Sequence, residues 1–312
     1  MDKFIILTDV TSDLSEEIRS YFDIKDYVHG HIHLGNDVAL KTTLDWELIS
    51  RDDFYGALDN KKIKVSTAPA SPEEYYEIFK SYASNGFDVL SISLSAKISS
   101  TYQVAVGASE RVKKEFPDRK IYCLDSCRMS GSLGLLTAFA HELKNNGKSF
   151  DEIITILEDA KHRIHQMGPI DDLMVVARRG RLSTGKAIMG SFAGVKPMGD
   201  CNRDGYVSVL AKVKGIKKAL SATVEYIKRS AVDIENNYII ITHSNREAYA
   251  LTLKEKLEAE LSPKKVFVSD VFSASGTNIG AGMICANFFG EPISESSDVE
   301  KEILTAAIEA CK

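Results

Sequence analysis

The 312-residue sequence lacks the features that mark membrane, secreted and nucleic-acid-binding proteins. No apolar run approaches the roughly 20 residues that a membrane-spanning helix needs. The apolar start is too short for a signal peptide and has no small-residue cleavage site. A net charge of −5 argues against an extended nucleic-acid or membrane surface. We therefore expect a soluble globular protein.

The five cysteines form no pairing pattern. Cys123 and Cys127 lie four positions apart, which is not the CxxC spacing of zinc and redox motifs. An odd number of cysteines without a signal peptide is typical of reduced thiols, so we expect a cytoplasmic protein. Free cysteines are usually buried and inert, and ordinary packing is the role expected here.

The first half of the sequence alternates between strand-like and helix-like segments. Capping-box patterns at Ser71 and Ser149 mark two helix starts. This order predicts an α/β fold with a mainly parallel sheet. The expected strands are residues 3–7, 61–65, 88–94 and 120–124, and the expected helices include 14–22, 101–115 and 132–145.

The second half predicts a smaller α/β domain with a hairpin. Asp204-Gly205 lies between apolar stretches, as in a hairpin turn. We place an N-terminal domain at residues 1–165 and a C-terminal domain at 166–312, with the ligand site between them. The expected strands of the second domain are 238–242 and 265–271, and its helices are 216–228 and 247–261.

Two hydroxyl-rich loops give the strongest functional signal. Ser66 and Thr67 follow one strand-like run, and residues 98–103, Ile-Ser-Ser-Thr-Tyr-Gln, follow another. Loops at the carboxyl ends of strands are where open α/β sheets bind ligands. Both loops are rich in neutral donors and poor in charge, which favours a small polar head group over a phosphate.

A P-loop-like run at residues 180–186 is a weaker motif. Ala187 stands where the motif needs Ser or Thr, and no convincing strand precedes the run, so nucleotide binding is not expected. The basic residues at 178–181 could instead hold an anion or a partner's acidic patch, or form a solvated loop.

Candidate catalytic and metal-binding residues are isolated from one another. Asp9 resembles the nucleophile of aspartate-based phosphatases, but Thr11 replaces the second Asp, so a capping role is favoured. The three histidines at 29–33 would share one face of a strand and could bind a transition metal, or form an exposed face. His243 is the best lone candidate for a general base, and a hydrogen-bonded loop residue is the alternative.

The glycine-rich stretch at residues 276–282 is predicted as a loop after the last strand. Asn278 stands where the second glycine of GxGxxG would be, so a dinucleotide fingerprint is excluded. Glycines there let the backbone approach a ligand closely. We expect a site-lining loop, and the alternative is a packing turn.

Together these segments resemble the DegV family of bacterial fatty-acid-binding proteins, in an order that covers almost the whole chain. The family's TDSTSDL, TSQPSP, LSGTYQSA and GGRIS segments are matched by residues 8–14, 66–72, 98–105 and 179–183, with DS at 125–126, KP at 196–197, DG at 204–205 and HTGPG at 278–282.

The resemblance implies a two-domain DegV-like fold that holds one long-chain fatty acid in an interdomain tunnel, without catalysis, cofactor or metal of its own. Some members are the acyl-carrying subunit of a fatty-acid kinase and present the carboxylate to a separate ATP-binding partner. Carried across to this sequence, the resemblance implies that the carboxylate is bound by Ser66 or Thr67, Ser99 and Asn278. It implies that the pocket is lined by Ile98, Ser100, Thr101 and Gly280. The kinase subunit would dock on Arg179 and Arg181.

Three residues depart from the family pattern. Asn278 replaces a histidine, and an amide can donate a hydrogen bond but cannot become cationic. Ser100 replaces the glycine of LSGT, and Arg179 replaces the first glycine of GGRIS.

Two other hypotheses stay open. One is a hydrolase or phosphotransferase acting on a small acid, built on the polar loops around Asp9, Asp125 and His243. The other is an interaction protein that uses the loop at residues 178–186.

Overall fold

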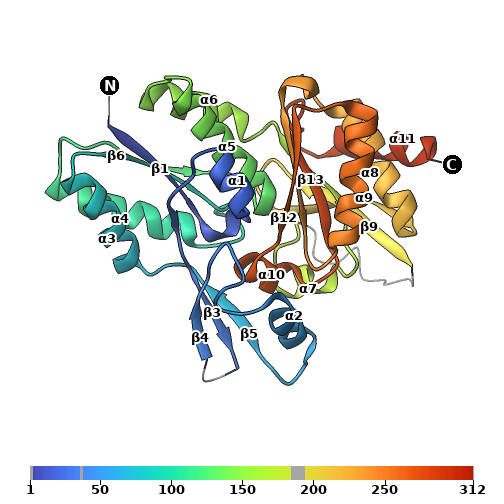
Figure 1. The fold of residues 1–312 in the computed structure, drawn as a ribbon, viewed down its shortest axis with the longest axis horizontal. Coiled ribbons are helices and arrows are strands. Elements are labelled where there is room, and N and C mark those ends of the chain that lie inside the picture. Colours follow the sequence, from blue (N-terminus) through green and yellow to red (C-terminus); the bar gives the residue numbers. More distant parts are fainter. Residues whose placement is uncertain (1–2, 36–37, 184–193, 312) are drawn as a thin grey trace.

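The computed structural model describes residues 3–35, 38–183 and 194–311. Within these residues the strands form a four-stranded, a six-stranded and a three-stranded sheet, with helices packed around and between them (Figure 1). None of the described helices is both long and apolar enough to cross a lipid bilayer.

The four-stranded sheet is parallel throughout, as the βα alternation predicts. Its central strand β6 is buried along its whole length, because apolar clusters cover both faces. Helices α3 and α4 pack on one face, and α5 packs on the other with α6 beside it. The order is β2 (Tyr27–Val28), β1 (Phe4–Asp9), β6 (Asp88–Ser93) and β7 (Ile121–Asp125), and the helices are α3 (Pro72–Ser84), α4 (Thr101–Glu115), α5 (Ser130–Asn145) and α6 (Phe150–Ala160).

The six-stranded sheet is mixed, and α8, α9 and α11 share one apolar core on its outer face. Among its paired strands, β11 and β12 are parallel, and the other pairings are antiparallel. The order is β10 (Val207–Lys214), β9 (Val195–Cys201), β8 (Ile164–Pro169), β13 (Ile284–Phe289), β11 (Tyr238–His243) and β12 (Lys265–Asp270), with α8 (Ile216–Ser230), α9 (Glu247–Leu261) and α11 (Asp298–Ala310).

Helix α5 lies between these two sheets and contacts strands of both (Figure 1). Eleven of its sixteen residues are buried, and two glycines permit its close approach. A Cβ at Gly134 would lie 2.6 Å from the Ser12 carbonyl oxygen, and one at Gly131 would collide with Asn287 Nδ2. The central helix therefore needs residues without side chains at these contacts.

A small unit of three strands and one helix projects from one edge of the molecule (Figure 1). We call it the three-stranded unit; it comprises β3 (His31–Leu34), β4 (Val38–Lys41), α2 (Arg51–Asp59) and β5 (Val65–Ala68). Helix α10 (Ser273–Ile279) contacts β3, β5 and α7 (Met174–Arg178), which joins this unit to the rest of the chain. The short elements η1 (Val10–Ser12), α1 (Glu16–Tyr21) and η2 (Ile234–Asn236) complete the fold.

Several sequence predictions are confirmed in detail. The helices at residues 101–115 and 247–261 have the predicted bounds. Both capping boxes form, and Gly205 has the positive φ of +98° that a tight hairpin turn favours.

Other predictions need correction. The strand predicted at 61–65 lies instead at Val65–Ala68. Strands β8 and β13 were not predicted, so the stretch at 276–282 does not follow the last strand, and it begins inside helix α10. The boundary proposed at residue 165 falls within β8, and the division into two domains stays a prediction.

Candidate functional site

A cavity of about 300 Å³ lies between the three sheets. Its wall takes residues from β1, β5, β8, β9 and β10, from the loop before α4, and from α7 and α10. The wall is largely apolar, and its volume falls at the lower end of typical ligand pockets, about 300–1,000 Å³. It is therefore the natural ligand site of this fold.

Thr67 and Asn278 meet on the cavity wall, although 211 positions separate them in the sequence. Strand β5 carries Thr67 and helix α10 carries Asn278. The Asn278 amide Nδ2 donates to Thr67 Oγ1 at 3.2 Å and to the Ala274 carbonyl oxygen at 3.2 Å. Because Thr67 Oγ1 accepts this bond, its own proton is available to a ligand.

A second polar group surrounds the N-terminus of α4. Ser99 Oγ lies 2.8 Å from Thr101 Oγ1 and accepts from the Thr101 N–H at 3.3 Å. Ile98, Ser99, Ser100 and Thr101, from the loop after β6 and the start of α4, all line the cavity. The N-terminus of a 15-residue helix presents unpaired N–H groups and a positive partial charge, which favours an anion here.

Two predicted site residues lie off the wall. Neither Ser66 nor Gly280 is among the described residues that line the cavity. Neighbouring side chains on a strand point to opposite faces, so Ser66 faces away when Thr67 faces the cavity. At Gly280, where φ is +77°, a Cβ would lie 3.0 Å from the Val175 side chain. This glycine allows α10 to end against α7.

Arg179 and Arg181, predicted to dock a partner, are both partly buried. Arg179 Nη2 donates to the Val65 carbonyl oxygen at 2.6 Å, which ties the end of α7 to β5. Arg181 lines the cavity, and its guanidinium donates to the Arg179 carbonyl oxygen. Burial lowers the pKa of Arg181, and no carboxylate of the described chain forms an ion pair with it. A cation without a counter-charge suits an anionic ligand.

The rest of the P-loop-like run, from residue 184 onward, lies outside the described residues.

Two carboxylates also line the cavity, but protein donors occupy their oxygens. Asp9 accepts from the N–H of Thr11 at 2.9 Å and of Leu94 at 2.8 Å, and burial raises its pKa. Asp200 accepts from the N–H of Gln166 at 2.8 Å and lies 2.9 Å from His165 Nδ1. The predicted capping role of Asp9 is confirmed, and it is not placed as a free nucleophile.

The three histidines at 29–33 do not share a common partner. His29 Nδ1 lies 2.7 Å from the Thr42 carbonyl oxygen, and His31 forms an ion pair with Glu74 at 3.0 Å. His33 is exposed on β3. Within the described part of the chain, no cluster of three or more histidines, cysteines and acidic residues is arranged to hold a metal ion.

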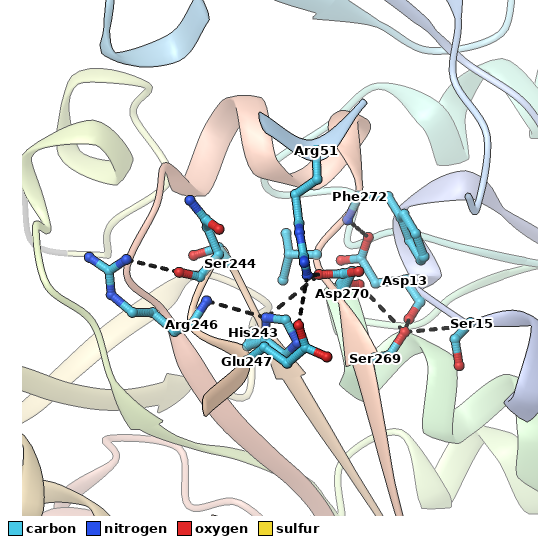
Figure 2. A network of polar contacts seen from close by, with 12 residues as sticks. Asp13, Ser15, Arg51, His243, Ser244, Arg246, Glu247, Ser269, Asp270 and Phe272 are labelled. Carbon is cyan, nitrogen blue, oxygen red and sulfur yellow. Dashed lines mark hydrogen bonds and ion pairs between the residues drawn. The ribbon is translucent and has the colours of Figure 1, made fainter. Parts of the chain in front are cut away.

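His243 belongs to a polar network at the ends of β11 and β12 (Figure 2). Its Nδ1 lies 3.6 Å from Asp270 Oδ1, and burial lowers its pKa. Asp270 also receives Arg51 Nη1 at 3.2 Å and Trp46 Nε1 at 3.0 Å, so the network fastens the three-stranded unit to the six-stranded sheet. His243 is not part of the cavity wall.

The residues proposed for a hydrolase are therefore not brought together. Asp125 accepts from the N–H of Ala96 at 3.1 Å and of Cys127 at 3.0 Å, and it shapes the loop after β7. Of Asp9, Asp125 and His243, only Asp9 lines the cavity.

Sequence reasoning did not identify the inner wall of the cavity. Its residues come from three strands and from the positions just before α5 and β13. They are Gln166 of β8, Met198 and Cys201 of β9, Cys285 of β13, and Met129 and Met283. Strand β8 reads Ile-His-Gln-Met-Gly-Pro, which is neither an apolar run nor a regular alternation, so it carries no clear strand signal.

Comparisons with known proteins agree with this architecture. A family model described as "Uncharacterised protein, DegV family" matches residues 3–291. A DegV domain-containing protein of Caldanaerobacter subterraneus is 30% identical over 280 residues, which cover 90% of this chain and 96% of the relative.

Solved structures show the same fold. DegV of Bacillus subtilis, described as a fatty acid binding protein, aligns with a TM-score of 0.79 and 25% identity over 93% of this chain and 100% of its own. A DegV family protein of Ruminococcus gnavus, refined with vaccenic acid, aligns with a TM-score of 0.81 and 20% identity over 91% of this chain and 99% of its own. Since the family model spans nearly the whole sequence, this chain belongs to the DegV family.

Proposed function

We propose that the protein binds one long-chain fatty acid, with the acyl tail in the cavity and the carboxylate against Thr67, Ser99, Asn278 and Arg181. The observation that carries the proposal is a largely apolar cavity whose wall also holds uncommitted donors and a cation without a counter-charge. The fatty-acid binding described for the Bacillus subtilis relative supports it.

The apolar wall accounts for most of the affinity. Leu173 and Val176 near α7, Ile279 of α10 and Met283 are among the residues available to the tail. Each buried methylene contributes about 0.8 kcal/mol, so a long tail approaches ~10 kcal/mol before ordering costs are subtracted. An acyl chain can therefore bind tightly with few polar contacts.

The polar groups remove the penalty of burying a carboxylate. An ionised carboxylate away from water needs hydrogen bonds and an opposite charge. The Thr67 hydroxyl, the α4 N-terminus at Ser99 and the Arg181 guanidinium all line the cavity and can supply both. Asn278 positions the Thr67 hydroxyl, which is a role that an amide performs without becoming cationic.

A titration of delipidated protein with stearic acid tests this assignment. The double variant Thr67→Val with Ser99→Ala should weaken binding by about a hundredfold or more, because two hydrogen bonds to a charged group are lost. Ser66→Ala is the matched control, since Ser66 lies one position away on the same strand but off the wall, and it should bind like the unmodified protein. Full affinity in the double variant would contradict the assigned site.

The finer part of the proposal is that the protein presents the carboxylate to a separate ATP-binding kinase subunit. One feature supports it: Thr67, Ser99 and Asn278 are only half-buried on the cavity wall, so a partner can approach a carboxylate bound there. Arg179 would shape this edge by holding β5, and Arg178, one position before it, is an exposed cation that can meet a partner.

Acyl phosphate formation from ATP and fatty acid, measured with purified kinase subunit, tests this part. We expect product only when both proteins are present. Product formed at the same rate without this protein would contradict the carrier role.

A further inference from the structure

Gln166 of β8 lines the inner part of the cavity. Its side chain is 6% exposed, and its neighbours on the wall include Met129 and Cys285, which are also buried. Thr67 and Asn278, in contrast, are only half-buried. Gln166 therefore lies deeper than the residues assigned to the carboxylate, on a part of the wall that an acyl tail would contact.

Only one end of the Gln166 amide has a strong partner. Ser132 Oγ lies 2.9 Å from Gln166 Oε1 and 2.6 Å from the Met129 carbonyl oxygen. The thiol of Cys285 also interacts with Gln166, but sulfur is a weak hydrogen-bond partner. Among the described residues, no oxygen or nitrogen atom binds the second end of the amide.

This imbalance does not depend on how the amide is oriented. With Oε1 toward Ser132, two N–H donors face away from it; with the amide reversed, a carbonyl oxygen does. In either orientation one polar end of a buried side chain is left to the cavity.

The other polar groups nearby are already satisfied. Asp200 accepts from the N–H groups of Gln166 at 2.8 Å and Cys201 at 2.6 Å, and its second oxygen lies 2.9 Å from His165. Ser130 Oγ donates to Asp13 Oδ2 at 2.6 Å. Gln166 is thus the residue of this inner wall that needs a partner from the ligand.

An unsubstituted alkyl tail cannot supply that partner, and it would seal an unsatisfied amide away from water. We propose that the preferred ligand is a hydroxy fatty acid, whose chain hydroxyl binds Gln166. A hydroxyl both donates and accepts, so it fits either orientation of the amide. This inference rests on the proposed function and specifies the chemical class of its ligand.

Competitive titration of the delipidated full chain tests the inference, with stearic acid and a series of hydroxystearic acids that differ in hydroxyl position. At least one hydroxystearic acid should bind about tenfold tighter than stearic acid, because its hydroxyl forms one additional hydrogen bond with Gln166. Gln166→Met, which conserves volume and removes the unsatisfied amide, should abolish the preference by raising the affinity for stearic acid. Met198→Leu, an apolar swap on the same wall, should keep the preference.

The outcomes separate this inference from the proposed function. If stearic acid binds and no hydroxystearic acid binds more tightly, the inference is overturned, and a water molecule then satisfies Gln166. Equal weakening of both acids by Gln166→Met would also overturn it, because Gln166 would then act on the carboxylate. If no acid binds the unmodified protein, the proposed function fails as well. The preference is measured in the unmodified protein, so the test does not depend on the folding of the variant.

Discussion

The three-stranded unit and the six-stranded sheet form walls of the same cavity, but different forces hold them in place. The six-stranded sheet shares a continuous apolar core with α8, α9 and α11. The three-stranded unit has a small apolar cluster around Phe54, and its attachment to β12 depends on polar contacts from Trp46 and Arg51 to Asp270. Regions with few buried apolar contacts open at the lowest free energy. We therefore expect the ligand to enter by movement of the three-stranded unit.

The bound ligand should also hold the three-stranded unit against the rest of the protein. Thr67 belongs to the three-stranded unit, whereas Arg181 follows α7 and Ser99 precedes α4. A carboxylate bound by all three would connect the mobile wall to the fixed ones. Fatty-acid binding should therefore slow hydrogen exchange in β5 and α2 more than in β11.

The largest expected effect comes from removing the same aromatic side chain from each region. Phe288 and Phe54 are both fully buried. Phe288→Ala should lower the global free energy of unfolding by about 3–5 kcal/mol in urea denaturation, because it leaves a cavity in the main core. Phe54→Ala should chiefly loosen the three-stranded unit, visible as faster hydrogen exchange in α2. Equal global losses in both variants would mean that the two regions unfold together.

Removal of the cavity cation should have the next largest effect. Arg181→Gln should weaken fatty-acid binding by about tenfold or more, because a hydrogen bond to a charged group contributes about 1.5–3 kcal/mol. Binding of the matching fatty alcohol should change much less, since it carries no charge. An equal loss for acid and alcohol, measured by titration, would indicate that Arg181 acts on the cavity's shape.

A smaller effect is expected at the attachment of the three-stranded unit. Asp270→Asn weakens the contacts with Arg51 and Trp46 and should accelerate release of bound fatty acid in stopped-flow exchange. The barrier to release should fall by only about 1 kcal/mol, because Arg51 is partly exposed and its ion pair with Asp270 is weakened by solvent. Glu247→Gln is the matched control, since it removes only the more exposed ion pair of Arg51. Unchanged release from Asp270→Asn would contradict the idea that this network retains the ligand.

The smallest effect concerns acid stability at the other side of the same unit. Partial burial alone would raise the pKa of Glu74, but hydrogen bonds from His31 and Ser71 outweigh it and lower the pKa to about 2. The ionised Glu74 carboxylate therefore contributes fully to the stability of the folded protein above the unfolded pKa near 4.5, and this contribution is lost as the pH falls toward 2. Glu74→Gln should flatten the dependence of hydrogen exchange in β3 on pH over this window. If hydrogen exchange in β3 depends on pH in the same way in the variant, the dependence comes from another carboxylate.

The sequence predicted local structure where short-range signals decide it. The capping boxes at Ser71 and Ser149 and the turn at Gly205 depend on neighbouring residues, and all three form. The hydroxyl-rich loop before α4 was identified because it follows a strand-like run that contains Val, Leu and Ile. The fold class could be predicted for the same reason.

The remaining features depend on contacts between distant residues. Strands β8 and β13 pair with each other across more than a hundred residues, and no local turn signal marks the pairing. The choice between Ser66 and Thr67 was set by the register of β5 against β3. Arg181 was assigned to a docking surface because its inward orientation depends on the packing of α7.

Mass spectrometry of an organic extract of the purified protein, made in a bacterial host, tests the central claim most directly. The account predicts one fatty acid per chain, and the identity of that acid will show whether its chain carries a hydroxyl. An empty extract, together with no uptake of added fatty acids, would contradict the proposal that this cavity is a fatty-acid site.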